Sequence, residues 1–325
     1  MTATEHGVWR DEPLSNLDAL TLAIESRPRL RTTIAAIAIC DGPLPARTLR
    51  HRVDRASRVI PRLRQRVVHD PRGLTAPMWR LDTDFELAAH LRTTRLGGGG
   101  TDRDLLDLAQ ELVVQPFDPA RPLWEFTRID GLADGRSALL LKSHHAVTDG
   151  VGGMRLMLEL FDLEPDPLPD RHELPPLPRR RAAGGPGSGT GAAVRREAAQ
   201  ALRGLRDGLD IAATAISDPA DAARLLGETL GSATRVLRPA RTPLSPLMRR
   251  RSDELELHRL RIPLRDLHEA GRRIGGTVND AFVAAVALGT LDHHTAHGVD
   301  LDRLRVSIPI DNRAGHTSPG NHFTP

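Results

Sequence analysis

Residues 137–150 read SALLLKSHHAVTDG, an apolar run that ends in the pattern HHxxxDG. The run Ala138–Leu141 is typical of a buried strand, and the two histidines follow where such a strand emerges into a loop. His145 is therefore well placed to move a proton, because an imidazole titrates close to neutral pH. Asp149 can order the loop, and Gly150 permits a tight turn before the next helix. We expect this stretch to carry catalytic side chains at the end of a strand.

The chemistry that this pattern suggests is acyl transfer, with His145 as the general base. When a thioester acylates an alcohol, a proton must leave the hydroxyl as it attacks the carbonyl, and a general base typically contributes about 10²–10⁴-fold. A buried structural histidine is the alternative interpretation. We expect His144 to pack or hydrogen-bond nearby, and Asp149 to order the loop rather than relay a proton.

The composition is that of a globular protein with few aromatic side chains. The chain has 325 residues, of which 39% are hydrophobic and 3% aromatic, with no tyrosine, and it can hold one large domain or two ordinary ones. The isoelectric point is about 10.1, yet the net charge is only +3. Lys142 is the only lysine, so almost nothing titrates between histidine and arginine. We therefore expect no nucleic-acid partner.

Neither a disulfide framework nor a membrane span is expected. Cys40 is the only cysteine, which excludes disulfide pairs within the chain and cysteine-based zinc sites. Glu5 and Arg10 precede any apolar stretch, unlike the pattern of a signal peptide. No apolar run approaches the ~20 residues that span a bilayer. We expect a cytoplasmic protein; peripheral contact with the inner membrane face or with lipid droplets stays open.

Hydrophobic periodicity predicts an α/β protein. The expected strands are 31–42, 64–69, 78–81, 124–129, 137–143, 256–263 and 304–310. The expected helices are 45–59, one that opens at Thr101 with an imperfect capping box and ends before Pro116, and 151–162, 193–237, 264–273 and 277–296. Strands 124–129 and 137–143 should form a hairpin-like pair whose second member delivers His145. Gly97–Gly100 is expected to be a flexible loop.

Composition divides the chain into three parts. Residues 1–163 form a first domain that carries HHxxxDG. Residues 164–252 begin with a Pro-, Arg- and Gly-rich linker and continue as a helical crossover. Residues 253–325 begin a second domain.

Two further motifs each have a functional and a structural interpretation. Pro122-Leu123-Trp124-Glu125 places a tryptophan at the start of a strand, either as a wall of a substrate pocket or as a core residue. Asn279-Asp280 opens an apolar helix. There Asp280 caps the helix, or Asn279 donates a hydrogen bond near the acyl oxygen. His293, His294 and His297 include an i,i+4 pair, but a solvated helix end is the expected interpretation, and no metal site is expected.

Taken together, these motifs resemble the bacterial wax ester synthase/diacylglycerol acyltransferase family of the chloramphenicol-acetyltransferase-like superfamily. The matching segments are His144–Gly150 (HHxxxDG), Pro122–Trp124 (PLW), Asn279-Asp280 (ND), the opening LSNLDAL from Leu14, Ser307-Ile308-Pro309 with Arg313, and Gly320-Asn321. HHxxxDG is shared across the superfamily and indicates mechanism, whereas PLW and ND narrow the family.

The resemblance implies two α/β domains with the active site at their junction. Acyl-CoA would be the co-substrate, diacylglycerol or a long-chain alcohol the acceptor, and no cofactor or metal would take part. His144, His145, Asp149 and Gly150 would form the catalytic motif. The residues expected to bind substrate are Pro122, Leu123, Trp124, Asn279, Asp280 and Arg313.

The second domain is expected to be incomplete, because family members continue well beyond the Gly-Asn segment. The apolar helix 281–291 should then be exposed. Two other functions stay open: a carrier-protein-dependent condensation or acyltransferase enzyme of the same superfamily, and an inactive module that binds a lipid surface.

Overall fold

The computed structural model describes most of the first half of the chain and parts of the second. The described residues are 8–9, 11–25, 27, 31–70, 77–148, 150–164, 173–180, 245–249, 252, 254–301, 303–304, 306, 310–311 and 323–324. The predicted helix 193–237 lies outside them. The chain divides into two compact units: Met1–Gly189 with Glu254–Leu257 and Arg313–His322 form unit 1, and the remaining residues form unit 2. The α/β class predicted from the sequence is confirmed.

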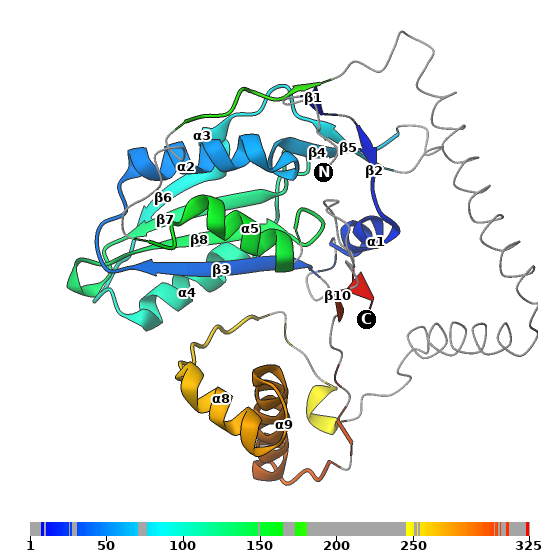
Figure 1. Cartoon of the computed structure of the whole chain (residues 1–325). Helices are drawn as coiled ribbons and strands as arrows, with labels where there is room; N and C mark the ends of the chain where they lie inside the picture. Colours follow the sequence, from blue (N-terminus) through cyan, green and yellow to red (C-terminus); the bar gives the residue numbers. More distant parts are fainter. Residues whose placement is uncertain are drawn as a thin grey trace, which may run out of the picture. The chain divides into compact units, whose positions relative to one another are not determined.

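A four-stranded sheet is the centre of unit 1 (Figure 1). Its order is β3 (Thr33–Cys40), β8 (Ser137–His144), β7 (Trp124–Asp130) and β6 (Leu91–Arg95). β8 pairs antiparallel with both β3 and β7, whereas β6 and β7 are parallel. The predicted hairpin is confirmed, with the short η3 (Ala133–Gly135) at its turn. β8 is therefore a central strand.

Helices cover both faces of this sheet. On one face lie α2 (Ala46–Val59) and α5 (Gly150–Leu160), and on the other lies α4 (Asp102–Val113) (Figure 1). Successive strand side chains point to opposite faces, so Leu139 and Leu141 join the core beneath α2 and α5. Ala138 and Leu140 join the core beneath α4. The continuous apolar run of β8 exists because both of its faces are buried.

A smaller antiparallel sheet and several short elements complete unit 1. The sheet consists of β2 (Glu12–Pro13), β5 (Met78–Leu81) and β4 (Gln65–Val68). The short helices are α1 (Asn16–Ile24), η2 (Pro61–Arg64) and α3 (Leu87–His90). A separate parallel pair is formed by β1 (Val8–Trp9) and β9 (Arg179–Arg180). Predicted strands 64–69 and 78–81 are confirmed. β6 was not predicted, because an edge strand with mostly polar side chains has no apolar alternation.

The glycine loop before α4 is well ordered by its neighbours. Gly100 has a φ of +67° and accepts a hydrogen bond from Ala133 N–H at 2.8 Å. Thr101 then begins α4 with a complete capping box, in which Thr101 and Asp104 bond reciprocally. The predicted loop is confirmed, but Gly100 is a buried packing position rather than a flexible linker.

Unit 2 contains two helices that the sequence predicted well. They are α8 (Leu264–Arg273) and α9 (Val278–Ala296), accompanied by η5 (Pro246–Met248) and the two-residue pair β10 (Ile310–Asp311) and β11 (Phe323–Thr324). The predicted strand 256–263 is wrong, since these residues pair with no neighbouring strand. Alternating side chains do not make a strand without a backbone partner. Leu257 instead packs against the core beneath α4.

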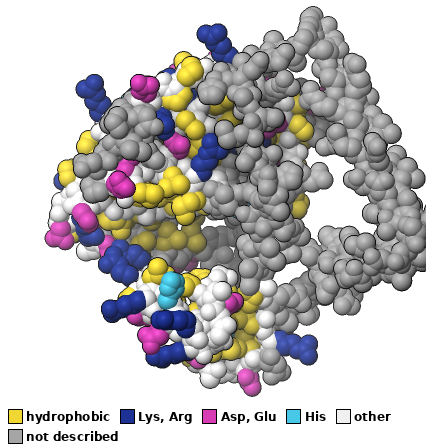
Figure 2. All heavy atoms as spheres, in the orientation of Figure 1, with side chains coloured by type: hydrophobic (Ala, Val, Ile, Leu, Met, Phe, Trp, Pro, Cys, Tyr) yellow, Lys and Arg dark blue, Asp and Glu magenta, His cyan; other side chains and the backbone are white. Residues whose placement is uncertain are grey.

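Large apolar side chains of α9 are exposed. Phe282, Val286 and Leu288 are each more than half exposed, as expected from the sequence for helix 281–291. In the part of the chain that the structure describes, no single helix is long and apolar enough to cross a membrane, although α8 and α9 together, bent by 89°, meet that length and composition. On the face shown in Figure 2, basic side chains are interspersed with acidic ones.

Candidate active site

The HHxxxDG motif lies where β8 leaves the sheet. His144 is the last residue of β8, opposite Thr33 of β3. The chain then turns: Val147 N–H donates to the His144 carbonyl, and His145 N–H donates to the Thr32 carbonyl, both at 2.9 Å. α5 begins at Gly150, one residue before the predicted start. Asp149 lies outside the described residues, so its predicted role stays a prediction.

His144 is completely buried, and both ring nitrogens are engaged. Its Nδ1 accepts a hydrogen bond from Ala146 N–H at 3.0 Å, so Nδ1 carries no proton. The proton of the neutral ring therefore lies on Nε2, which is 3.3 Å from Glu25 Oε2 and 3.1 Å from Thr32 Oγ1. Burial lowers the pKa of His144, although the Glu25 carboxylate acts in the opposite direction. This geometry holds His144 as a neutral ring in one tautomer.

His145 differs from its neighbour in its exposure. His145 is partly exposed as a residue, with its Nδ1 buried, whereas His144 is fully covered. A protonated His144 would need Nδ1 to give up its bond from Ala146 N–H, so His144 is poorly suited to accept a proton. His145 is the histidine of the motif with access to solvent.

An apolar cavity of about 320 Å³ lies against His144. Its walls come from α1 and its flanks, β4, and the segment that precedes β7. The lining residues are Leu14, Ala19, Leu22, Ala23, Glu25, Val67, His69, Pro77, Pro116, Phe117, Pro119, Leu123 and His144. Apolar side chains dominate, with Glu25, His69 and His144 as the polar groups. A cavity of this kind suits a hydrocarbon chain with a polar end.

The PLW segment is hydrogen-bonded directly to the HH motif. His144 N–H donates to the Leu123 carbonyl at 2.9 Å, and the Leu123 side chain lines the apolar cavity. Pro122 is buried beside it. The structure thus brings two motifs together that are about twenty residues apart in the sequence.

Trp124 lies in the core of unit 1. Its side chain has no exposed surface, its ring stacks on His90 with centroids 4.5 Å apart, and its Nε1 donates to the Leu63 carbonyl at 2.8 Å. These surroundings favour the core interpretation of Trp124. Direct contact of its ring with substrate stays a prediction.

The ND motif lies in unit 2, at the first turn of α9. Asp280 accepts hydrogen bonds from Thr277 N–H at 2.7 Å and from the Thr277 hydroxyl at 2.8 Å, and its own N–H donates back to that hydroxyl. These bonds lower the pKa of Asp280. The capping interpretation of Asp280 is therefore confirmed. Asn279 lines an open hollow of about 630 Å³ together with His268 and Arg272.

Other predicted features give less information. Arg313, Ser307-Ile308-Pro309 and Gly320-Asn321 lie outside the described residues. The predicted solvated helix end is wrong for His294, which is buried with its Nε2 2.7 Å from Ser245 Oγ. His297 Nδ1 bonds to the His293 carbonyl at 2.8 Å. Within the described part of the chain, no group of three or more His, Cys, Asp or Glu side chains could hold a metal ion.

Sequence reasoning missed Glu25 and Thr32. Both contact the ring of His144, but they are 119 and 112 positions away along the chain. Glu25 follows α1 and Thr32 precedes β3, and no motif spacing marks either. The antiparallel pairing of β3 with β8 is what brings them to the histidines.

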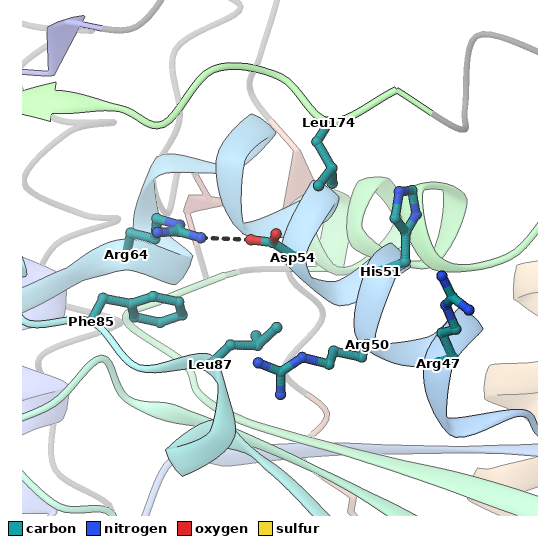
Figure 3. Close-up of a pocket in the computed structure, with 8 residues that line it drawn as sticks. All are labelled: Arg47, Arg50, His51, Asp54, Arg64, Phe85, Leu87 and Leu174. Atoms are coloured by element: carbon teal, nitrogen blue, oxygen red, sulfur yellow. Dashed lines mark hydrogen bonds and ion pairs between the residues drawn. The ribbon is translucent and has the colours of Figure 1, made fainter.

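Another hollow, of about 380 Å³, lies along α2 (Figure 3) and shares no residue with the predicted site. Its lining residues are Arg47, Arg50, His51, Asp54, Arg64, Phe85, Leu87 and Leu174. The Asp54 carboxylate binds Arg64 at 2.8 Å and Arg58 at 2.7 Å, and the Arg64 guanidinium stacks over the Phe85 ring. These contacts join α2 to η2 and to the segment before α3.

Comparison with known proteins identifies the family. The family model described as "Wax ester synthase/diacylglycerol acyltransferase catalytic domain" matches residues 14–282. The chain belongs to this acyltransferase family. The match includes the HHxxxDG, PLW and ND motifs, so the resemblance predicted from them is confirmed.

Relatives from mycobacteria agree with this assignment. "Putative diacyglycerol O-acyltransferase Rv2484c" of Mycobacterium tuberculosis H37Rv is 36% identical over 318 residues, which are 96% of this chain and 64% of that protein. "Probable diacyglycerol O-acyltransferase tgs1" of the same strain is 28% identical over 314 residues, 93% of this chain and 62% of that protein. The chain thus spans less than two thirds of the length of these relatives.

Among solved structures, the wax ester synthase/diacylglycerol acyltransferase from Marinobacter aquaeolei VT8 is 28% identical. The matched region covers 50% of this chain and 41% of the Marinobacter chain, with a TM-score of 0.38.

Proposed function

We propose that this acyltransferase transfers an acyl group from acyl-CoA to the free hydroxyl of diacylglycerol, which would form triacylglycerol. Long-chain alcohols would serve as further acceptors and give wax esters. The observation that carries the proposal is the HH turn, bonded to the PLW segment and adjoining an apolar cavity of about 320 Å³.

In the proposed mechanism His145 acts as the general base. The acceptor hydroxyl oxygen attacks the thioester carbonyl carbon, and its proton passes to the imidazole of His145. The C–O bond forms, the C–S bond breaks, and the CoA sulfur leaves and takes the proton from His145. The products are an ester and free CoA, and His145 returns to its neutral state.

The surroundings of the two histidines support His145, rather than His144, as the base. His144 is fixed as a neutral ring by its bonds to Ala146 and Glu25, whereas His145 is partly exposed. A base must be reachable by the acceptor hydroxyl, and His145 is the more exposed histidine of the pair.

The test is a CoA-release assay with the whole chain, palmitoyl-CoA and dioleoylglycerol, and hexadecanol as a second acceptor. We expect acceptor-dependent release in the parent and at least about a 100-fold lower rate in His145→Ala. The matched control is His51→Ala on α2, which should keep the parent rate. Full activity in His145→Ala would refute the base assignment. No release with either acceptor would refute acyl-CoA-dependent transfer by this chain.

We also propose that the protein works at a lipid surface, because diacylglycerol does not dissolve in water. The test is co-flotation with phosphatidylcholine vesicles that contain or lack dioleoylglycerol. Flotation with the diacylglycerol vesicles supports the proposal, and recovery in the unbound fraction with both vesicle types contradicts it.

A further inference from the structure

Glu25, Thr32 and the HH turn form one hydrogen-bonded network. Thr32 N–H donates to Glu25 Oε2 at 3.1 Å, and the Thr32 hydroxyl is 3.1 Å from His144 Nε2. The Thr32 carbonyl accepts the N–H of His145 at 2.9 Å. Thr32, which precedes β3, therefore contacts both histidines, and its own N–H is bonded to Glu25.

The Glu25 carboxylate and the Ala146 N–H both favour a proton on Nε2 of His144. An ionised carboxylate can only accept hydrogen bonds, so Glu25 Oε2, at 3.3 Å, requires a proton on Nε2. Nδ1 is then free to accept the bond from Ala146 N–H. The opposite tautomer would place two hydrogens against each other at Nδ1 and leave no donor toward Glu25. The tautomer and the shape of the turn are thus coupled.

In the described part of the chain, one oxygen of the Glu25 carboxylate is bonded and the other is not. Its Oε1 is buried and has no hydrogen-bond partner among the described residues. Glu25 lines the apolar cavity together with leucine and proline side chains. A carboxylate in such surroundings interacts strongly with the donors that it does have.

We propose that Glu25 is a positioning residue for acyl transfer: it fixes the Nε2–H tautomer of His144 and, through Thr32 and the turn, the place of His145. This inference rests on the proposed function for its catalytic part. Its structural part concerns only the ring of His144 and the turn that follows.

The variants that test this are Glu25→Gln, which keeps the size of the side chain, and Glu25→Ala. A glutamine can donate to Nε2 as well as accept from it, so it no longer imposes one tautomer. Thr32→Val removes the hydroxyl while Glu25 stays, and should leave the tautomer unchanged. Glu111→Gln, on the exposed face of α4, is the matched control.

The first readout is the ring ¹⁵N spectrum of the histidines in the full chain, with His144 assigned from a His144→Gln variant. We expect a pure Nε2–H tautomer in the parent. In Glu25→Gln and Glu25→Ala the turn loses its hold through Thr32, which weakens the Ala146 bond to Nδ1, and we expect a share of the Nδ1–H tautomer. The groups that face or influence the ring are Glu25, Asp18, His145 and, across Phe117, Lys142. Spectra are therefore compared at one fixed pH for all variants.

The second readout is steady-state kinetics with palmitoyl-CoA and dioleoylglycerol. A displacement of the base should lower kcat by about 10- to 100-fold with little change in KM. A pure Nε2–H tautomer in both Glu25 variants, or an unchanged kcat, would overturn the proposal. Urea denaturation of each variant identifies any loss that comes from unfolding. If the parent releases no CoA, the proposed function fails, yet the ¹⁵N comparison still decides whether Glu25 sets the tautomer.

Discussion

At the scale of single residues, two buried tryptophans of unit 1 differ by one hydrogen bond. Trp124 and Trp79 are both fully covered. The indole N–H of Trp124 donates to the Leu63 carbonyl, whereas that of Trp79 has no partner within the described part of the chain. We expect Trp124→Phe to lower the free energy of unfolding by about 1–3 kcal/mol more than Trp79→Phe, because it leaves a buried carbonyl unpaired. Urea denaturation of the two variants measures this difference.

The same pair of variants also decides the role of the PLW tryptophan. Equal losses of stability would contradict the hydrogen-bond argument. If Trp124→Phe kept its stability but raised KM for palmitoyl-CoA, the pocket-wall interpretation of Trp124 would replace the core interpretation. Leu123 is the PLW side chain that reaches the apolar cavity.

At the scale of elements, the loop between β6 and α4 depends on a glycine. A Cβ at Gly100 would lie 2.4 Å from the Gly131 carbonyl oxygen, whereas a Cβ at Gly135 would meet nothing within 4 Å. Both residues have positive φ, so Gly135→Ala should cost only the left-handed strain of about 1–2 kcal/mol. We expect Gly100→Ala to cost roughly 1–3 kcal/mol more because of the overlap.

Urea or thermal denaturation of the two alanine variants measures this comparison, with the parent as reference. Similar losses in both would show that the loop can move away from η3 without cost. A larger loss in Gly100→Ala would show that the contact between this loop and the β7–β8 turn helps to fix the start of α4.

Capping residues and amphipathic patterns made α2, α4, α5, α8 and α9 predictable, whereas α1 and the short α3 were not predicted. The start of α4 at Thr101 and of α9 at Thr277 follow from local hydrogen bonds between residues three apart. Strands were less predictable, because a strand needs a partner elsewhere in the chain. β6 has polar side chains and was missed, and residues 256–263 have strand-like alternation but no partner.

At the scale of the whole molecule, two buried histidines make stability depend on pH. The main cause in both His90 and His144 is burial, which lowers the pKa of each from its ordinary value of 6.5. The unfolded chain therefore binds more protons than the folded one between the folded pKa and 6.5. The contribution of these two histidines to the free energy of unfolding is fully present above pH 6.5. It decreases as the pH falls from 6.5 through the folded pKa.

We expect the free energy of unfolding to be lower at pH 5.5 than at pH 7.5. Each histidine contributes a slope of at most about 1.4 kcal/mol per pH unit. Urea denaturation across this range measures the slope. His90→Phe should reduce the slope, whatever it does to stability at pH 7.5, and His51→Phe on α2 serves as the control. A slope in His90→Phe equal to that of the parent would contradict the assignment to His90.

The sequence by itself determined what depends on neighbouring residues. It located β8, the HHxxxDG turn, the capped helices and the family, because periodicity, caps and motifs are local patterns. Only the tertiary structure decided which histidine is accessible and which is locked. Glu25 and Thr32 reach His144 through the pairing of β3 with β8, and the cavity forms where α1, β4 and the chain before β7 meet. Burial and charge at a site are set by residues distant in sequence, and no local pattern records them.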